Sequence, residues 1–162
     1  MLINILVIII GLFLLIALES FFSTLFSFSI LVIVLLLMID KMSWKKWVIL
    51  SVLSTILIDI LLLRSIGTTL LIVAIISAFL YLLFLLMPKK EALFSYLPYF
   101  FAVFLFYILL DLLTPFVQDG VWGILTWQSV LKDMVRTTIS TVIIFLTNLV
   151  IDNFRAKDIL KL

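Results

Sequence analysis

Two carboxylates inside apolar stretches are the first residues of this sequence that could do chemistry. Asp59 lies near the end of the apolar segment 47–63, and Asp111 lies at a similar depth in the segment 92–113. Carboxylates at matched depth could bind a cation, relay a proton or hold a partner, or each could form only local hydrogen bonds near the water interface. Catalysis is disfavoured because no nucleophile, phosphate loop or set of metal ligands accompanies them.

A polar stripe accompanies the first carboxylate. Ser51, Thr55 and Asp59 recur at a spacing of four residues, so on a helix they share one face. A central aspartate costs roughly 2.5–3.5 kcal/mol on membrane-insertion scales, so this face should point at other helices. Arg64 follows at the helix end, where it could fold back and pair with Asp59. Gly67 is expected to permit a tight turn, most simply as a C-cap glycine.

The composition indicates an integral membrane protein. The 162 residues are 67% hydrophobic and 12% charged, and the mean hydropathy is +1.48. Soluble domains are nearer 45–50% apolar and about 25% charged. No polar segment is longer than a loop, so residues 1–162 should form one transmembrane domain. Cysteine and histidine are absent, which removes disulfides, thiol nucleophiles and the usual zinc sites. We therefore expect no enzyme, no cofactor and no nucleic-acid partner.

Six apolar segments predict an all-α bundle of about six transmembrane helices. Each approaches the ~20 residues that a spanning helix needs; they are Leu2–Leu18, Phe21–Ile39, Trp47–Leu63, Thr68–Met87, Ala92–Leu113 and Thr137–Ile151. Glu19 and Ser20 should form a solvated turn between the first two. The aromatic residues of the fifth segment are expected on a surface that faces lipid or a partner. Pro115 should end that segment, because proline disfavours helix in the residue before it.

The segment before the last span has a different character. Residues 118–136 mix charged side chains with apolar ones at the spacing of one helical face: Ile124, Trp127, Leu131 and Met134. This pattern predicts a short amphipathic helix at the membrane interface. In the last span, Thr137, Thr141 and Asn148 share a face from which they could hydrogen-bond to other helices.

The distribution of Lys and Arg predicts the orientation. Six spans place eight of these residues on one side of the membrane: Lys41, Lys45, Lys46, Lys89, Lys90, Arg155, Lys157 and Lys161. The other side holds three: Arg64, Lys132 and Arg136. Because short cytoplasmic loops carry the excess of Lys and Arg, both termini should be cytoplasmic.

The first half of the chain resembles the MreD family of bacterial rod-shape membrane proteins. The resemblance covers residues 15–87 and rests on ALES at 17–20, a second aliphatic span, a short basic loop and LIDILLLRSIG at 57–67. The last stretch is similar to that family's G-L-x-x-D-(hydrophobic)-x-x-x-L-G signature, with Asp59 at the aspartate and Gly67 at the final glycine. The chain departs from the signature at its first glycine, which is Ser54 or Thr55 here, and at Ile66. The second span also lacks the Pro-Asp start of many members.

The resemblance implies a non-enzymatic scaffold in the bacterial cytoplasmic membrane. Such a scaffold would bind the bitopic protein MreC and, through it, RodA and a class B penicillin-binding protein in the elongation complex that makes peptidoglycan. Partner-binding or structural roles would fall to Asp59, Arg64, Gly67 and Asp111. The family's fold is similar to the substrate-binding subunits of energy-coupling-factor vitamin transporters, so a solute-binding subunit is the alternative. A ligand-sized cavity of ~300 Å³ or more would favour the transporter subunit, and an exposed apolar groove would favour the scaffold.

Overall fold

The computed structural model of the chain describes residues 10–11, 13–14, 16–23, 28–39, 41–86 and 96–159, with side chains up to residue 151. A helical stretch over 16–23 precedes five longer helices: α2 (Ile30–Ile39), α3 (Trp44–Leu61), α4 (Thr68–Leu86), α5 (Leu97–Asp119) and α6 (Trp127–Ile159). These ranges contain no strand. The predicted all-helical class is therefore confirmed for the described part of the chain, while most of the first predicted span lies outside it.

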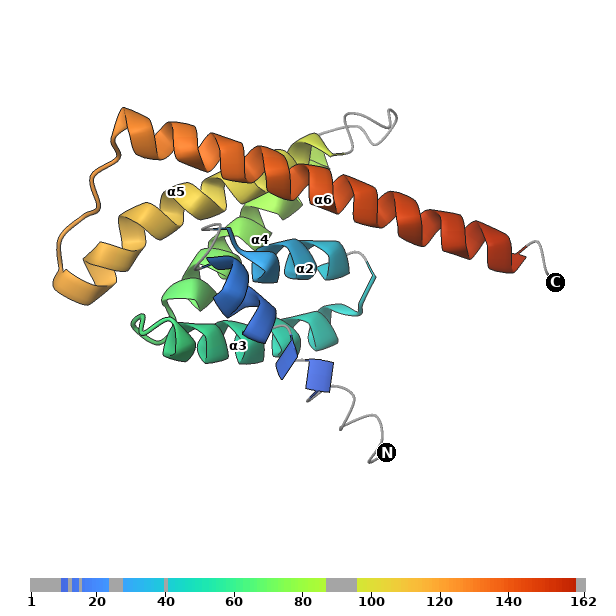
Figure 1. Ribbon diagram of the computed structural model, residues 1–162, viewed down its shortest axis with the longest axis horizontal. Coiled ribbons are helices and arrows are strands. Elements are labelled where there is room, and N and C mark those ends of the chain that lie inside the picture. The colour runs from blue at the N-terminus through green and yellow to red at the C-terminus, as the bar shows by residue number, and fades with distance from the viewer. Residues whose placement is uncertain are drawn as a thin grey trace.

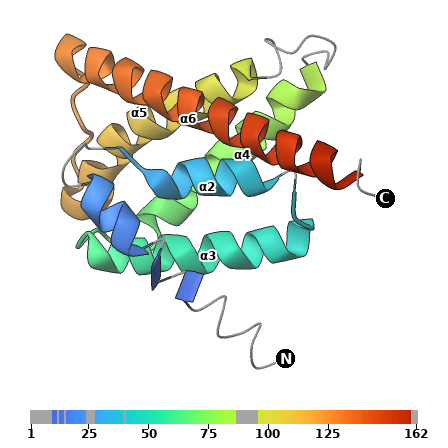
Figure 2. The same ribbon diagram turned by 45° about the vertical axis from the view of Figure 1, so that its right-hand side comes forward.

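The helices run back and forth between two ends of the molecule. The α3–α4 and α5–α6 connections lie at one end, and the α2–α3 connection and the C-terminus lie at the other (Figure 1). Helix α4 packs against α3 and α5, and α5 packs against α6. Helix α2 contacts α3, α5 and α6, and both views place it in the middle of the bundle (Figure 2).

Helix α2 is buried because it is apolar all round. Its sequence, ILVIVLLLMI, has no polar face, as expected of a helix surrounded by others. Val32 and Leu36 join a core built with α4 and α5, whereas Leu31 and Leu35 pack against α3. The Trp47 indole of α3 donates a hydrogen bond to the Leu35 carbonyl oxygen at 2.9 Å. The side chains of one short helix thus connect the two halves of the core.

The predicted second span is wrong in extent. Residues 28–29 are not helical, and α2 has only 10 residues. At 1.5 Å per residue it is about 15 Å long, half of the ~30 Å hydrocarbon core. Three helices in the described ranges are long and apolar enough to cross a membrane: Thr68–Leu86, Leu97–Asp119 and Trp127–Ile151. They give the chain the character of a membrane protein.

Proline does not end α5, contrary to prediction. Pro115 lies inside the helix, which continues to a left-handed Gly120 cap with φ +71°. Proline removes the N–H that would have bonded the Asp111 carbonyl four residues earlier. The loop after α5 returns to this position, where the Gly123 N–H donates to the Leu112 carbonyl at 3.2 Å. The α5–α6 loop thus packs on the backbone that proline leaves open.

The predicted interfacial helix does not form as a separate element. Residues 120–126 are not helical, and Trp127 begins the 33-residue helix α6. The apolar residues at 127, 131 and 134 are exposed, while Asp133 and Thr137 are fully buried. The segment was predicted to turn its polar face to water. Instead, Asp133 points into the bundle, Lys132 next to it is exposed, and the apolar residues lie on the outer surface of α6.

The hydroxyl groups of α6 mostly bond within their own helix, which corrects the expectation of bonds to other helices. Thr137 donates to the Asp133 carbonyl at 2.7 Å, and Thr141 donates to the Thr137 carbonyl at 2.8 Å. Asn148 alone of the predicted set bonds to another element, since its Oδ1 accepts from Lys41 Nζ at 2.8 Å.

Candidate functional site

The buried Asp59 carboxylate holds the turn between α3 and α4. Its Oδ2 accepts the N–H of Gly67 at 2.8 Å, and the Thr69 N–H lies 3.2 Å from Oδ2 and 3.3 Å from Oδ1. These donors belong to the first turn of α4, where the N–H groups lack partners inside the helix and favour a negative charge. Ser51 and Thr55 are also buried, so the predicted inward orientation of the polar stripe is confirmed.

Gly67 is not a C-cap glycine. Helix α3 ends at Leu61 with Leu62 as its C-cap, and Gly67 is the residue directly before α4. Its φ is +93°, a conformation that residues with a Cβ rarely adopt. Leu63 in the same turn also has a positive φ of 53°. The expected constrained backbone is present, and its role is to aim an N–H at Asp59.

Glu19 forms the same kind of contact at the start of α2. Its Oε1 accepts from Ser29 Oγ at 2.6 Å, and its Oε2 accepts from the Leu31 N–H at 2.7 Å. The side chain is only 3% exposed and lies in the helical stretch 16–23. The prediction of a solvated turn at 19–20 is therefore wrong. The signal that could have found this role is a carboxylate 10–12 residues before its donors, the separation that also relates Asp59 to Thr69.

A polar cavity lies beside the α3–α4 turn and the helical stretch 16–23. Its volume is about 240 Å³, and its lining includes four charged side chains from four elements: Glu19, Arg64, Asp111 and Arg136. Tyr107 also lines it, and the Tyr107 hydroxyl accepts the Ser29 N–H at 3.0 Å. Tyr107 is only 2% exposed, so this aromatic residue of α5 is part of the interior rather than of a lipid-facing surface.

Asp133 and Arg136 form an ion pair beside the cavity. Arg136 Nη1 lies 3.0 Å from Asp133 Oδ1, and the guanidinium carbon lies 5.6 Å from the centre of the Tyr107 ring. The second Asp133 oxygen is buried and has no hydrogen-bond partner. Neither residue was a candidate in the sequence, because the interfacial helix predicted for this segment placed its charges in water.

Arg64 does not form an ion pair with Asp59. In the described ranges no ion pair within 4.0 Å joins the two side chains. Instead, the Arg64 backbone N–H donates to the Asp59 carbonyl at 2.8 Å. Burial lowers the pKa of the Arg64 guanidinium, while the negative charges of Asp59 and Glu19 act in the opposite direction. The hypothesis of a folded-back pair is replaced by a backbone bond that closes the turn.

Asp59 and Asp111 do not form a common site. Asp59 caps α4, whereas Asp111 lines the polar cavity. Among the described residues no group of three or more acidic, His or Cys side chains could hold a metal ion. The arrangement can cap helices, close turns and place a few charges around a small volume.

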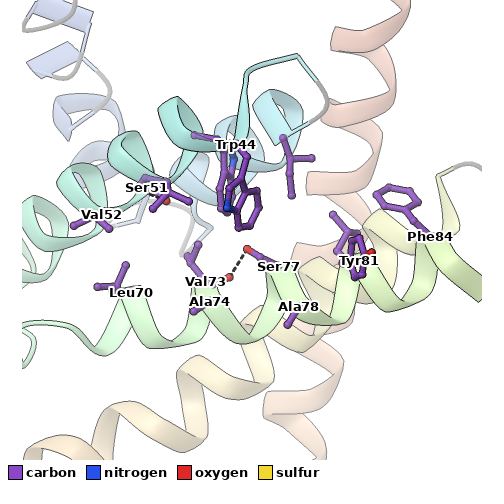
Figure 3. Close-up of a pocket in the computed structure, with 14 residues that line it drawn as sticks. Trp44, Ser51, Val52, Leu70, Val73, Ala74, Ser77, Ala78, Tyr81 and Phe84 are labelled. Carbon is purple, nitrogen blue, oxygen red and sulfur yellow. Dashed lines mark hydrogen bonds between the residues drawn. The ribbon is translucent and has the colours of Figure 1, made fainter.

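A groove of about 670 Å³ lies between α3 and α4 (Figure 3). We call it the α3–α4 groove. Its lining side chains are all uncharged: Ile39, Trp44, Trp47, Val48, Ser51, Val52, Leu70, Val73, Ala74, Ser77, Ala78, Leu80, Tyr81 and Phe84. The Ser51 hydroxyl donates a hydrogen bond to the Val48 carbonyl at 2.9 Å, and the Ser77 hydroxyl donates one to the Val73 carbonyl at 2.6 Å. The groove therefore offers an occupant mainly apolar contact.

The fold and these two features define the class: a helical protein of membrane character, with a polar cavity near one end and an apolar groove along its side. Comparison with known proteins adds no narrower identity, since no family model, curated protein or solved structure matches the chain.

Proposed function

We propose that the chain is a non-enzymatic scaffold of the MreD type in the bacterial elongation complex. It binds a bitopic MreC-like partner and, through it, RodA and a class B penicillin-binding protein. The main support for the proposal is the α3–α4 groove. The proposed occupant of this groove is the partner's single transmembrane helix. The groove lining is uncharged, and α4 contributes the small residues Ala74, Ser77 and Ala78, which let another helix approach closely.

The contact between Asp59 and Gly67 supports the same proposal. The stretch 57–67 carries the resemblance to the MreD signature, and its two matched residues are joined by one hydrogen bond of 2.8 Å. That bond fixes the turn between α3 and α4, so it fixes the angle between the two walls of the groove. The signature residues then act on the partner through the shape of the groove rather than by touching it.

The proposed topology has both termini in the cytoplasm and six segments in the cytoplasmic membrane. The eight-to-three distribution of Lys and Arg supports this orientation. The connection between α2 and α3 then faces the cytoplasm, and the connections α3–α4 and α5–α6 lie at the outer end (Figure 1). In this orientation α2 is a short helix that crosses only part of the hydrocarbon core.

The solute-binding alternative has less support. Small-molecule sites enclose about 300–1,000 Å³ and orient the ligand with a few polar groups. The polar cavity is smaller, at about 240 Å³. The α3–α4 groove is large enough, but no charged side chain lines it and its serine hydroxyls are already bonded.

The proposal is tested by filling the groove. Ala74→Phe places a ring in it, whereas Ile75→Phe changes the next residue of α4, which is exposed and outside the groove lining. The full chain is tagged, extracted in mild detergent and assayed for recovery of the MreC-like partner. Recovery should fall about tenfold for Ala74→Phe, equivalent to ~1.4 kcal/mol, and remain at the wild-type level for Ile75→Phe. Equal recovery with both variants would overturn the proposal.

A further inference from the structure

Two charged side chains in the polar cavity have no bonding partner. The Arg64 guanidinium comes from the α3–α4 turn, and the Asp111 carboxylate comes from α5. Within the described part of the chain, neither side chain forms a hydrogen bond or an ion pair, with each other or with a third residue. Both are partly buried. A partly buried charge without a direct hydrogen bond or ion pair is unfavourable, so each of these groups would gain from a ligand.

The other charges of the cavity are already engaged. The Glu19 carboxylate accepts from Ser29 and Leu31, and Arg136 pairs with Asp133 at 3.0 Å. One free positive group and one free negative group remain. This combination disfavours a simple anion, which Asp111 would repel, and a simple cation, which Arg64 would repel.

We propose that the polar cavity binds a small zwitterion, with its phosphate or carboxylate on Arg64 and its ammonium group on Asp111. A guanidinium suits either anion, because its planar fork can donate two parallel hydrogen bonds. The volume of about 240 Å³ corresponds to roughly eight water molecules at ~30 Å³ each. A group the size of phosphoethanolamine has about as many non-hydrogen atoms and fits this space.

The charges around Asp111 and around Arg64 both favour binding of a zwitterion. The negative charge of Asp133 acts repulsively on Asp111, so an ammonium group near them would be stabilised by both. At the other end, the Arg64 guanidinium is unfavourably buried in the empty protein. Asp59 and Glu19 attract the Arg64 guanidinium, but both carboxylates are engaged at helix N-termini. A bound anion would add the direct hydrogen bonds that neither carboxylate makes to Arg64.

The ligand could come from the membrane or from solution. The cavity lining includes Arg64 of the α3–α4 turn and Phe106, Tyr107, Leu110 and Asp111 from the middle of α5. In a protein that crosses a bilayer, the α3–α4 turn lies near the lipid headgroups, so a phosphatidylethanolamine headgroup that reaches inward past this turn is one source. A soluble amino-phosphate or amino acid is the other, and it carries the same pair of charges.

The test uses native mass spectrometry of the full chain in detergent. It is titrated with dihexanoyl phosphatidylethanolamine, with dihexanoyl phosphatidylglycerol, which lacks the ammonium, and with soluble phosphoethanolamine. The ethanolamine lipid should bind about tenfold more tightly than the glycerol lipid. Arg64→Gln and Asp111→Asn should each weaken that binding about tenfold, or ~1.4 kcal/mol. Binding of the soluble compound as well would identify a solute site, and binding of the lipid alone would identify a headgroup site.

Matched controls separate binding from folding. Asp119→Asn and Lys132→Gln neutralise exposed charges on α5 and α6 outside the cavity lining, and they should leave binding unchanged. Arg64→Gln removes a partly buried charge that makes no direct hydrogen bond or ion pair through its side chain among the described residues. It should therefore not lower the unfolding temperature. Equal binding of all the variants, or of both lipids, would overturn the proposal whatever the recovery of the MreC-like partner.

Discussion

The Asp59 carboxylate and the Gly67 backbone are joined directly, with 2.8 Å between Asp59 Oδ2 and the Gly67 nitrogen. Asp59 and Gly67 are eight positions apart, and the seven residues between them are the end of α3 and the turn that leads to α4. A carboxylate suits the N-terminus of a helix, which favours negative charge, and the φ of +93° at the donor favours glycine. The length of the turn between α3 and α4 therefore sets the number of residues that separate Asp59 from Gly67.

Removal of the Asp59 side chain should destabilise the protein. Asp59→Ala leaves the N–H groups of the partly buried Gly67 and the buried Thr69 without an acceptor. An unsatisfied buried donor costs about 1–3 kcal/mol, so the unfolding temperature in detergent should fall clearly. Asp59→Asn keeps one acceptor oxygen and should have a smaller effect. Asp119→Ala removes an exposed carboxylate and serves as the control; an equal shift in both alanine variants would contradict the capping role.

A methyl group at Gly123 should disrupt the packing of the α5–α6 loop on α5. The added Cβ would overlap the carbonyl oxygen of Asp111, a backbone atom with little freedom to move. Overpacking of this kind costs about 1–3 kcal/mol. Gly123→Ala should therefore lower the unfolding temperature and speed proteolysis within residues 120–126. Gly11→Ala places its Cβ in open space, and a comparable effect there would show that the close contact is not the cause.

Loss of the Tyr107 hydroxyl should affect the start of α2. Tyr107→Phe keeps the buried ring but leaves the Ser29 N–H without the acceptor that lies 3.0 Å away. We expect destabilisation of about 1–3 kcal/mol, measured as a lower unfolding temperature. Tyr81→Phe removes a hydroxyl from a side chain that is 69% exposed, and it should change little. If the two variants behave alike, the Tyr107–Ser29 bond does not hold α2 in place.

The sequence was informative where polar residues are rare and local spacing decides their partners. Helix α4 begins at the predicted Thr68 and is described as far as Leu86, while the predicted end at Met87 lies outside the described residues. The burial of Asp59 also followed from the cost of a charge in an apolar segment. These predictions needed no knowledge of which helices are neighbours.

The errors arose where the outcome depends on contacts far along the chain. Pro115 was expected to end its helix, but Gly123 packs on the backbone that proline frees. The segment 118–136 was expected to form a separate helix at the interface, but its second half continues into α6 and Asp133 is buried against other helices. Glu19 was assigned to water because its donors, Ser29 and Leu31, lie beyond the predicted turn.

The two carboxylate caps also bear on the order in which contacts can form along the chain. Each carboxylate is made before its donors, which follow 10 and 12 residues later for Glu19 and 8 and 10 residues later for Asp59. Closing such short loops costs little chain entropy. Each carboxylate can therefore accept its hydrogen bonds as soon as the start of the next helix has been synthesised, before the rest of the bundle is complete.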